Sequence, residues 1–160
     1  LLDEASAKVM KQHGAFLVPT LATYSVLAEE GQRLKWSDEM LGKLDRVKDA
    51  GTQAIAIAKA AGVPVAFGTD LLGSMHPQQA REWRLRAGVQ TPVEQLQSAT
   101  SVAAKVLNQE GKLGVIAPGA HADLIVVDGD PTVDILLMGE PERHFVGIMK
   151  AGKWEKPLPA

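Results

Sequence analysis

Two short apolar runs, each preceded by the pattern of a helix, constrain the fold of this chain more than any other feature. Residues 15–18 (Ala-Phe-Leu-Val) follow a helical pattern that begins at Asp3 and stops at Gly14. Residues 64–67 (Pro-Val-Ala-Phe) follow a longer helical pattern that Ser37 can cap. Because helices that alternate with short apolar strands are typical of βα units, this order predicts an α/β fold with a parallel sheet.

The second apolar run leads directly into Gly68, Thr69 and Asp70, and Asp70 is the candidate residue with the clearest chemical meaning. Side chains at the carboxyl ends of parallel strands project from a rigid sheet into a shared crevice. A carboxylate in that position can hold a metal ion and move a proton during hydrolysis. Taken alone, however, the pattern favours an Asp that only caps the following turn.

The character of the sequence changes towards its carboxyl end. Thr91, Pro92 and Glu94 predict the start of a capped helix. Beyond this helix, short β runs alternate with turn residues rather than with helices. These β runs cover residues 113–116, 122–127 and 145–149. We therefore predict two parts, an α/β part over residues 1–110 and a strand-rich part over residues 111–160.

Composition excludes several classes of function. The chain has 160 residues and a net charge of -2 with scattered Lys and Arg, which argues against a nucleic-acid partner. No apolar run approaches the length of a membrane span, so we expect no membrane partner. The lack of Cys leaves His and carboxylates as ligands for any zinc and is compatible with the cytoplasm, the location that we expect. Since the chain begins at Leu1 without a Met, a targeting signal can lie upstream.

Several motifs occur in an order that is found in one group of enzymes. Residues 91–107 (TPVEQLQSATSVAAKVL) are followed by residues 112–128 (KLGVIAPGAHADLIVVD) and then by a terminal Gly-Lys-Trp turn. This order resembles the last barrel helix and the following strands of the amidohydrolase superfamily. The segments FGTDLLGSMHPQQAREW and HGAFLVPTLATY resemble its prolidase (Xaa-Pro dipeptidase) and imidazolonepropionase-like branch. The resemblance extends from Leu1 to about Lys156.

The resemblance implies an architecture. The family fold is a metal-dependent (β/α)8 TIM-like barrel with a small β-sandwich built from both chain ends. By resemblance, residues 15–18 are barrel strand seven, residues 64–68 are strand eight, and the chain after about Leu113 supplies carboxyl-terminal strands of the sandwich. The chain is then a carboxyl-terminal fragment with the last two strands and helices of the barrel.

The resemblance also implies a site. In the family, the Asp that ends strand eight binds the metal and handles the proton of the attacking water, a role that maps onto Asp70. The implied cofactor is a divalent metal, zinc in our prediction, with one or two ions in the complete enzyme. The other family ligands are a His-x-His pair on strand one, a carboxylated Lys or a Glu on strand four, and His on strands five and six. This chain has no His-x-His, and its four histidines lie elsewhere: His13, His76, His121 and His144.

Other polar residues after the second apolar run have structural and functional interpretations. His76 can contact a substrate carboxylate, or it can cap a helix that begins at Pro77. Arg81, Arg84 and Arg86 point in several directions around that helix, so we expect them to form a solvated face.

The function implied by the resemblance is hydrolysis of an amide C–N bond by metal-activated water. The implied substrate is a small molecule, either a dipeptide of the Xaa-Pro type or an N-acyl amino acid. A rival interpretation is an incomplete, non-catalytic fragment or a module that depends on a partner, because most metal ligands are lacking. We expect the chain alone to be inactive and to form oligomers or aggregates, and the complete enzyme is compatible with a homo-oligomer.

Overall fold

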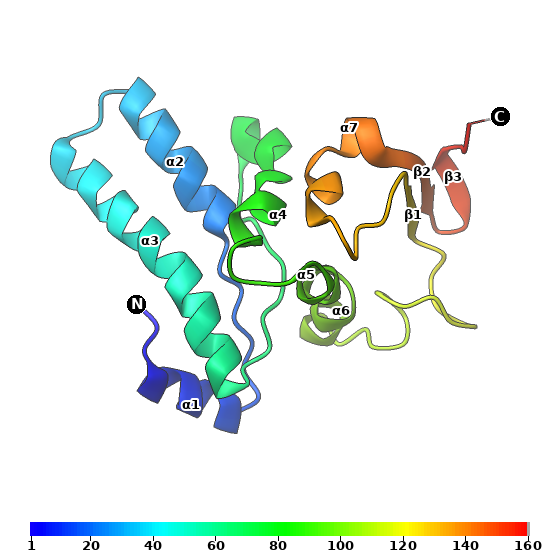
Figure 1. Ribbon diagram of the computed structural model, residues 1–160, viewed down its shortest axis with the longest axis horizontal. Coiled ribbons are helices and arrows are strands. Elements are labelled where there is room, and N and C mark those ends of the chain that lie inside the picture. The colour runs from blue at the N-terminus through cyan, green and yellow to red at the C-terminus, as the bar shows by residue number, and fades with distance from the viewer. Residues whose placement is uncertain (160) are drawn as a thin grey trace.

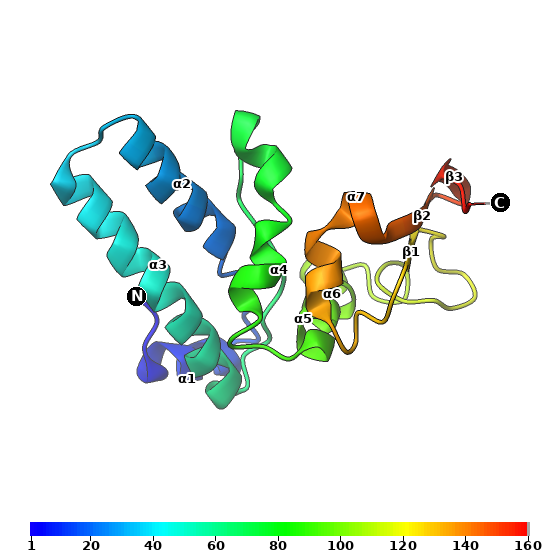
Figure 2. The same ribbon diagram turned by 45° about the horizontal axis from the view of Figure 1, so that its top comes forward.

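The computed structural model describes residues 1–159 and shows a mixed helix and strand architecture (Figure 1). The α-helices are α1 (Glu4–Gln12), α2 (Leu21–Arg33), α3 (Asp38–Ala61), α4 (Arg81–Arg86), α5 (Pro92–Ala99), α6 (Ser101–Val106) and α7 (Pro141–His144). The 3-10 helices are η1 (Gly73–Gln78) and η2 (Ile135–Gly139), and the strands are β1 (Leu124–Val127), β2 (Phe145–Lys150) and β3 (Lys153–Lys156). The α2–α3 hairpin stands at one end of the molecule and the strands at the other, with α4 to α6 between them (Figures 1 and 2).

The predicted helix ends are formed by the residues that the sequence indicated. Asp3 begins α1 and accepts a hydrogen bond from the Ser6 amide at 2.7 Å. Ser37 begins α3 and accepts a hydrogen bond from the Met40 amide at 3.4 Å. Gly62 ends α3 with a φ of 71°, a left-handed conformation that glycine adopts readily. These caps satisfy backbone groups that helix ends otherwise leave without partners.

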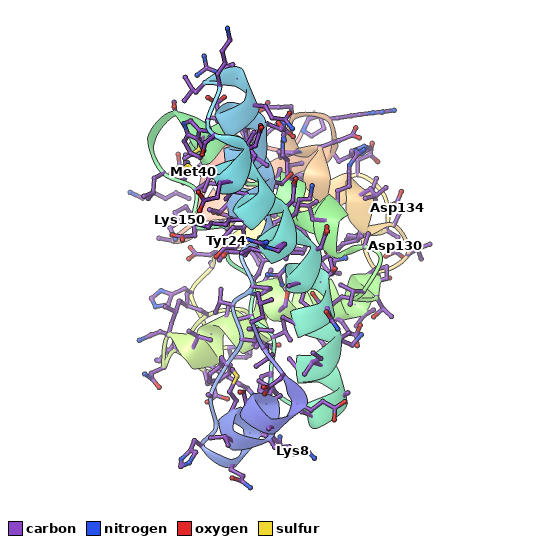
Figure 3. The ribbon with its side chains drawn as sticks, turned by 90° about the vertical axis from the view of Figure 1, so that its left-hand side faces the viewer. Lys8, Tyr24, Met40, Asp130, Asp134 and Lys150 are labelled. Carbon is purple, nitrogen blue, oxygen red and sulfur yellow. The ribbon has the colours of Figure 1, made fainter. Side chains whose placement is uncertain are left out.

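Helices α2 and α3 form an antiparallel hairpin whose close contact depends on a glycine (Figure 2). A Cβ atom at Gly51 of α3 would overlap the Leu21 side chain of α2. In Figure 3 the molecule is viewed from the side on which α3 lies, so that α3 is in front, and Lys8 of α1 lies near the bottom of the view. The main core cluster joins these helices to the second apolar run and consists of Ala7, Leu21, Ile55, Ala58, Val63 and Val65. Among residues 1–159, no helix has both the length and the apolar character to cross a membrane.

The two apolar runs lie side by side, but they do not form the strands that the sequence predicted. A single parallel bridge pairs Leu17 with Val65. The Leu17 amide donates to the Pro64 carbonyl and the Ala66 amide donates to the Leu17 carbonyl, both at 2.9 Å. Pro64 has no N–H to extend the ladder, and the Phe67 amide donates to a carbonyl of α5 at 3.0 Å instead. The prediction of parallel neighbours is confirmed, whereas the prediction of full strands is wrong.

The helix predicted over residues 91–107 begins as expected but is divided. Thr91 Oγ1 accepts from the Glu94 amide at 3.3 Å, and the Glu94 carboxylate accepts from the Thr91 amide at 2.7 Å, which completes a capping box. At Thr100 the backbone leaves the helical conformation, with φ -121° and ψ -92°, and separates α5 from α6. Gly114 lies against this backbone, where a Cβ atom would overlap the Thr100 carbonyl group. The break accommodates this close approach, so the prediction of one continuous helix is wrong.

The carboxyl-terminal part contains a three-stranded antiparallel sheet in the order β1-β2-β3. The β runs predicted at residues 122–127 and 145–149 contain β1 and most of β2. Ala151 and Gly152 join β2 to β3 with φ values of 49° and 78°, as the left-handed positions of a tight hairpin turn require. The turn that the sequence indicated at the terminal Gly-Lys-Trp segment is therefore confirmed, and it closes a hairpin.

The strand predicted at residues 113–116 is wrong, because this segment forms bends. Gly114 has a φ of 69°, which interrupts an extended backbone in the middle of the run. The apolar side chains of this run are not buried, since Leu113 is half-buried and Ile116 is 90% exposed.

The pKa of Glu94 lies below its ordinary value. Partial burial acts to raise it, but hydrogen bonds from Lys59 Nζ and from the Thr91 amide, both at 2.7 Å, outweigh that effect. The ionised carboxylate therefore stabilises the fold above the pKa of the unfolded state, about 4.3. This stabilisation is lost as the pH falls through the lower pKa of the folded state.

We predict that Glu94→Gln lowers the free energy of unfolding at pH 7, because it removes this charge. The difference from the wild type should shrink as the pH falls below about 4.3, the ordinary pKa of a Glu carboxyl, and vanish once the carboxyl is protonated in the folded state. Denaturant unfolding followed by circular dichroism at several pH values measures both effects. Glu39→Gln is the matched control, since Glu39 forms an exposed pair with Lys43 in α3, and such pairs contribute little to stability. A difference for Glu94→Gln that does not shrink as the pH falls below about 4.3 would contradict this account.

Candidate functional site

Asp70 follows the segment that pairs with Leu17, and its side chain is exposed. Its φ is 51°, a left-handed conformation that few residues other than glycine adopt and that aspartate tolerates better than most. Thr20, which follows the neighbouring segment, is also left-handed, with a φ of 47°. Because the two segments run parallel, both turns lie at their common carboxyl end.

The first turn of α2 holds the backbone that precedes Asp70. The Thr23 hydroxyl donates a hydrogen bond to the Thr69 carbonyl oxygen. Gly68 lies directly against Val18, and a Cβ atom on this glycine would overlap Cγ1 of the valine. The glycine therefore permits this close approach of the two segments.

A buried ion pair joins α4 to the start of α2 and to the segment before Asp70. The Glu82 and Arg86 side chains are both fully buried, and Arg86 Nε lies 2.6 Å from Glu82 Oε1. Glu82 Oε2 also accepts from the Ala22 amide of α2 at 2.6 Å, and Arg86 Nη2 donates to the Ala66 carbonyl at 3.1 Å. The prediction that Arg86 belongs to a solvated face is therefore wrong, because its hydrogen-bond partners all lie inside the fold.

Aromatic and amide side chains complete the surroundings of Arg86. Its guanidinium carbon lies 4.8 Å from the centroid of the Phe67 ring, and Trp83 packs on that ring with centroids 4.3 Å apart. Gln90 Oε1 accepts from Arg86 Nη1 at 3.4 Å. Burial lowers the pKa of Arg86, and the Glu82 carboxylate acts against this effect. Within the part of the chain that the structure describes, no buried side-chain nitrogen or oxygen lacks a hydrogen-bond partner.

The other predicted residues lie in η1 and α4. His76 is exposed in η1, and Pro77 lies inside η1, whereas α4 begins at Arg81. The interpretation of His76 as the cap of a helix that begins at Pro77 is therefore wrong, and a contact with substrate stays a prediction. Arg81 forms an exposed ion pair with Glu29 of α2 at 2.6 Å, and Arg84 is also exposed, as the sequence predicted for both.

Among residues 1–159, Asp70 does not belong to any group of three or more side chains of the types that bind metal ions. In residues 1–159, no group of three or more His, Cys, Asp or Glu side chains could hold a metal ion. A zinc site needs three or four protein ligands, so these residues do not form a complete site by themselves. The remaining histidines lie elsewhere: His13 ends α1, His121 lies in the loop before β1, and His144 ends α7.

Comparison with known proteins identifies the family. The sequence profile of the amidohydrolase family matches residues 1–158. This chain belongs to the amidohydrolase family. Its members are generally metal-dependent, and the related proteins of known activity include hydrolases. The family assignment agrees with the resemblance that the sequence motifs indicated.

Three amidohydrolase relatives illustrate the similarity. A prolidase solved in complex with N-methylphosphonate-L-proline is 45% identical, with a TM-score of 0.90 over 98% of this chain. A Xaa-Pro dipeptidase solved with bound methionine in its active site is 28% identical, with a TM-score of 0.84 over 98% of this chain. The ochratoxinase of Aspergillus niger is 29% identical over 153 residues, which is 94% of this chain. The chain spans 38% of each solved structure and 31% of the ochratoxinase.

Sequence reasoning missed the side chains that support the Asp70 turn, namely Thr23, Glu82 and Arg86. Glu82 and Arg86 have the i,i+4 spacing of an ordinary exposed helical pair, and this spacing alone does not indicate burial. One signal in the sequence could have indicated that α4 is partly buried. Trp83, which is adjacent to Glu82, is a large apolar residue, and it packs against Phe67 in the structure.

We predict that the 160-residue chain alone does not retain zinc, because Asp70 lacks partner ligands among residues 1–159. Elemental analysis after loading and dialysis against a chelator should find well below one zinc per chain. Asp70→Asn is the matched control and should retain no less zinc than the wild type. Stoichiometric zinc that resists the chelator would contradict this prediction.

Proposed function

We propose that this chain is the carboxyl-terminal part of a metal-dependent hydrolase that cleaves an amide C–N bond. The supporting observation is its 45% identity to a prolidase over 98% of the chain, together with an exposed Asp70 where two parallel segments end. In this proposal, the parallel segments 15–18 and 64–68, which form a single bridge here, take the places of strands seven and eight of a (β/α)8 barrel, and residues 111–160 belong to a β-sandwich. The remaining metal ligands belong to a part of the complete protein outside residues 1–160.

Asp70 is the proposed metal ligand and the group that moves the proton. A divalent metal, zinc in our proposal, polarises the substrate carbonyl and lowers the pKa of bound water when it is present. The Asp70 carboxylate accepts a proton from the attacking water and delivers it to the leaving nitrogen. This delivery matters because an amine anion is a very poor leaving group.

The proposed substrate is a dipeptide of the Xaa-Pro type or an N-acyl amino acid. The similarity to a prolidase and to a Xaa-Pro dipeptidase favours the dipeptide. His76, exposed in η1 shortly after Asp70, is the proposed contact for the carboxylate of such a substrate. A cation or hydrogen-bond donor at this position suits a carboxylate because its hydrogen bonds are charge-assisted.

A second candidate is a non-catalytic module that depends on a partner. Two observations favour it: residues 1–159 contain no metal-binding group, and Ile125 and Trp154 of the sheet are 48% and 45% exposed. The coding sequence upstream of Leu1 distinguishes the candidates. An enzyme requires a His-x-His pair, a later Lys or Glu and two further His residues there, whereas a partner-dependent module does not.

We predict that Asp70→Asn, made in the complete protein, lowers kcat for Xaa-Pro dipeptides by at least about a hundredfold. The substitution keeps the size of the side chain but removes the proton acceptor and one negative charge. Steady-state kinetics measures the loss, and circular dichroism establishes that the fold is intact.

The matched control is Asp49→Asn, an exposed aspartate of α3, which should leave kcat within about twofold of the wild type because surface substitutions away from the site have small effects. Near-normal turnover by Asp70→Asn would show that Asp70 only forms a turn.

A further inference from the structure

We propose that Glu82 and Arg86 are positioning residues that hold the Asp70 turn in place from inside the fold. Neither side chain reaches Asp70 directly, and both act through the backbone of neighbouring segments. The inference rests on the proposed role of Asp70, since a positioned carboxylate matters only where it does chemistry. Helix α4, which carries both residues, lies between α2 and α5 (Figure 1).

Arg86 holds the amino-terminal end of residues 66–69, the segment directly before Asp70. Its Nη2 donates to the Ala66 carbonyl at 3.1 Å, four residues before the aspartate. Its guanidinium carbon also lies 4.8 Å from the centroid of the Phe67 ring, which Trp83 covers at a centroid distance of 4.3 Å. A planar guanidinium can donate along one edge while it lies over an aromatic ring, which an ammonium group does less well.

Glu82 supports the carboxyl-terminal end of the same segment, and it does so indirectly, by way of α2. Its Oε2 accepts from the Ala22 amide at 2.6 Å. The next residue of α2, Thr23, donates its hydroxyl to the Thr69 carbonyl, directly before Asp70. Because the two charged side chains bind each other at 2.6 Å, the contacts form a closed ring that holds residues 66–69 at both ends.

The backbone of the two turns needs such support. Asp70 and Thr20 both have left-handed φ values, 51° and 47°, that residues with a Cβ atom rarely adopt. Conformations of this kind persist when the surrounding structure holds them, and they cluster at functional sites. The ring supplies that constraint with hydrogen bonds of defined direction, which apolar packing alone does not provide.

The test replaces both charges together, as Glu82→Leu with Arg86→Met, in the complete protein. Removing one charge would leave the other buried without a partner, whereas an apolar pair of similar volume often preserves stability. We expect amide hydrogen exchange over residues 66–70 to accelerate by about tenfold or more, with α3 unchanged. For an Xaa-Pro dipeptide, kcat should fall by about tenfold, with KM within about twofold, because positioning acts on the reacting group.

The matched control is Glu29→Leu with Arg81→Met. This pair joins the same helices, α2 and α4, at 2.6 Å, but it is exposed. We expect its removal to change neither the exchange over residues 66–70 nor kcat. If the buried double variant does not fold, Arg86→Lys replaces it, because a lysine keeps the charge but cannot hold Glu82 and the Ala66 carbonyl in the same geometry.

The proposal would be overturned if hydrogen exchange over residues 66–70 is unchanged in Glu82→Leu with Arg86→Met, or in Arg86→Lys where that variant replaces it. It would also be overturned if hydrogen exchange in α3 accelerates by the same factor. The exchange measurement does not depend on catalysis. Failure of the positioning role therefore appears as unchanged exchange while Asp70→Asn still lowers kcat by about a hundredfold or more. Failure of the proposed function appears instead as normal turnover by Asp70→Asn.

Discussion

The Arg86 charge is buried beside Glu82, and the contacts of this pair determine how α4 meets the rest of the fold. Taking a charged group out of water costs roughly several kcal/mol, which the partner charge and additional hydrogen bonds must offset. Both side chains are fully buried, and further polar atoms of the pair bind backbone groups of α2 and of the segment before Asp70, and the Gln90 side chain. Helix α4 is therefore held against these two elements by specific bonds rather than by apolar contact alone.

This arrangement explains how the backbone near Asp70, the proposed catalytic residue, is held in one conformation. Leu17 and Val65 form only one parallel bridge, so the backbone ladder between the two segments is short. The ion pair and the Thr23 hydroxyl supply the additional hydrogen bonds where these segments end. The chain thus contains a well-supported position for one carboxylate. In our proposal the residues that share the metal with it belong to the rest of the complete hydrolase.

The elements that the sequence predicted well are those with local signals. Asp3, Ser37 and Thr91 begin helices as their capping side chains indicated, and the hairpin before β3 has the left-handed turn that Ala151 and Gly152 form. These features depend on bonds within a few residues, which a single sequence displays directly.

The features that the sequence did not predict depend on distant partners. The burial of Arg86 follows from contacts with Ala66 and α2, which no i,i+4 pattern indicates. The division of the helix lies at Thr100, where Gly114, which is distant in the sequence, packs against the backbone. The family, by contrast, was predictable from the order of motifs, since the amidohydrolase profile covers residues 1–158.

The most direct test of the account is a crystal structure of the complete protein grown with zinc. We expect the Asp70 carboxylate to coordinate the metal at about 2.0–2.2 Å, with the Glu82–Arg86 pair intact behind it. A metal bound without Asp70, or an Asp70 side chain directed into solvent away from the metal, would contradict the central claim.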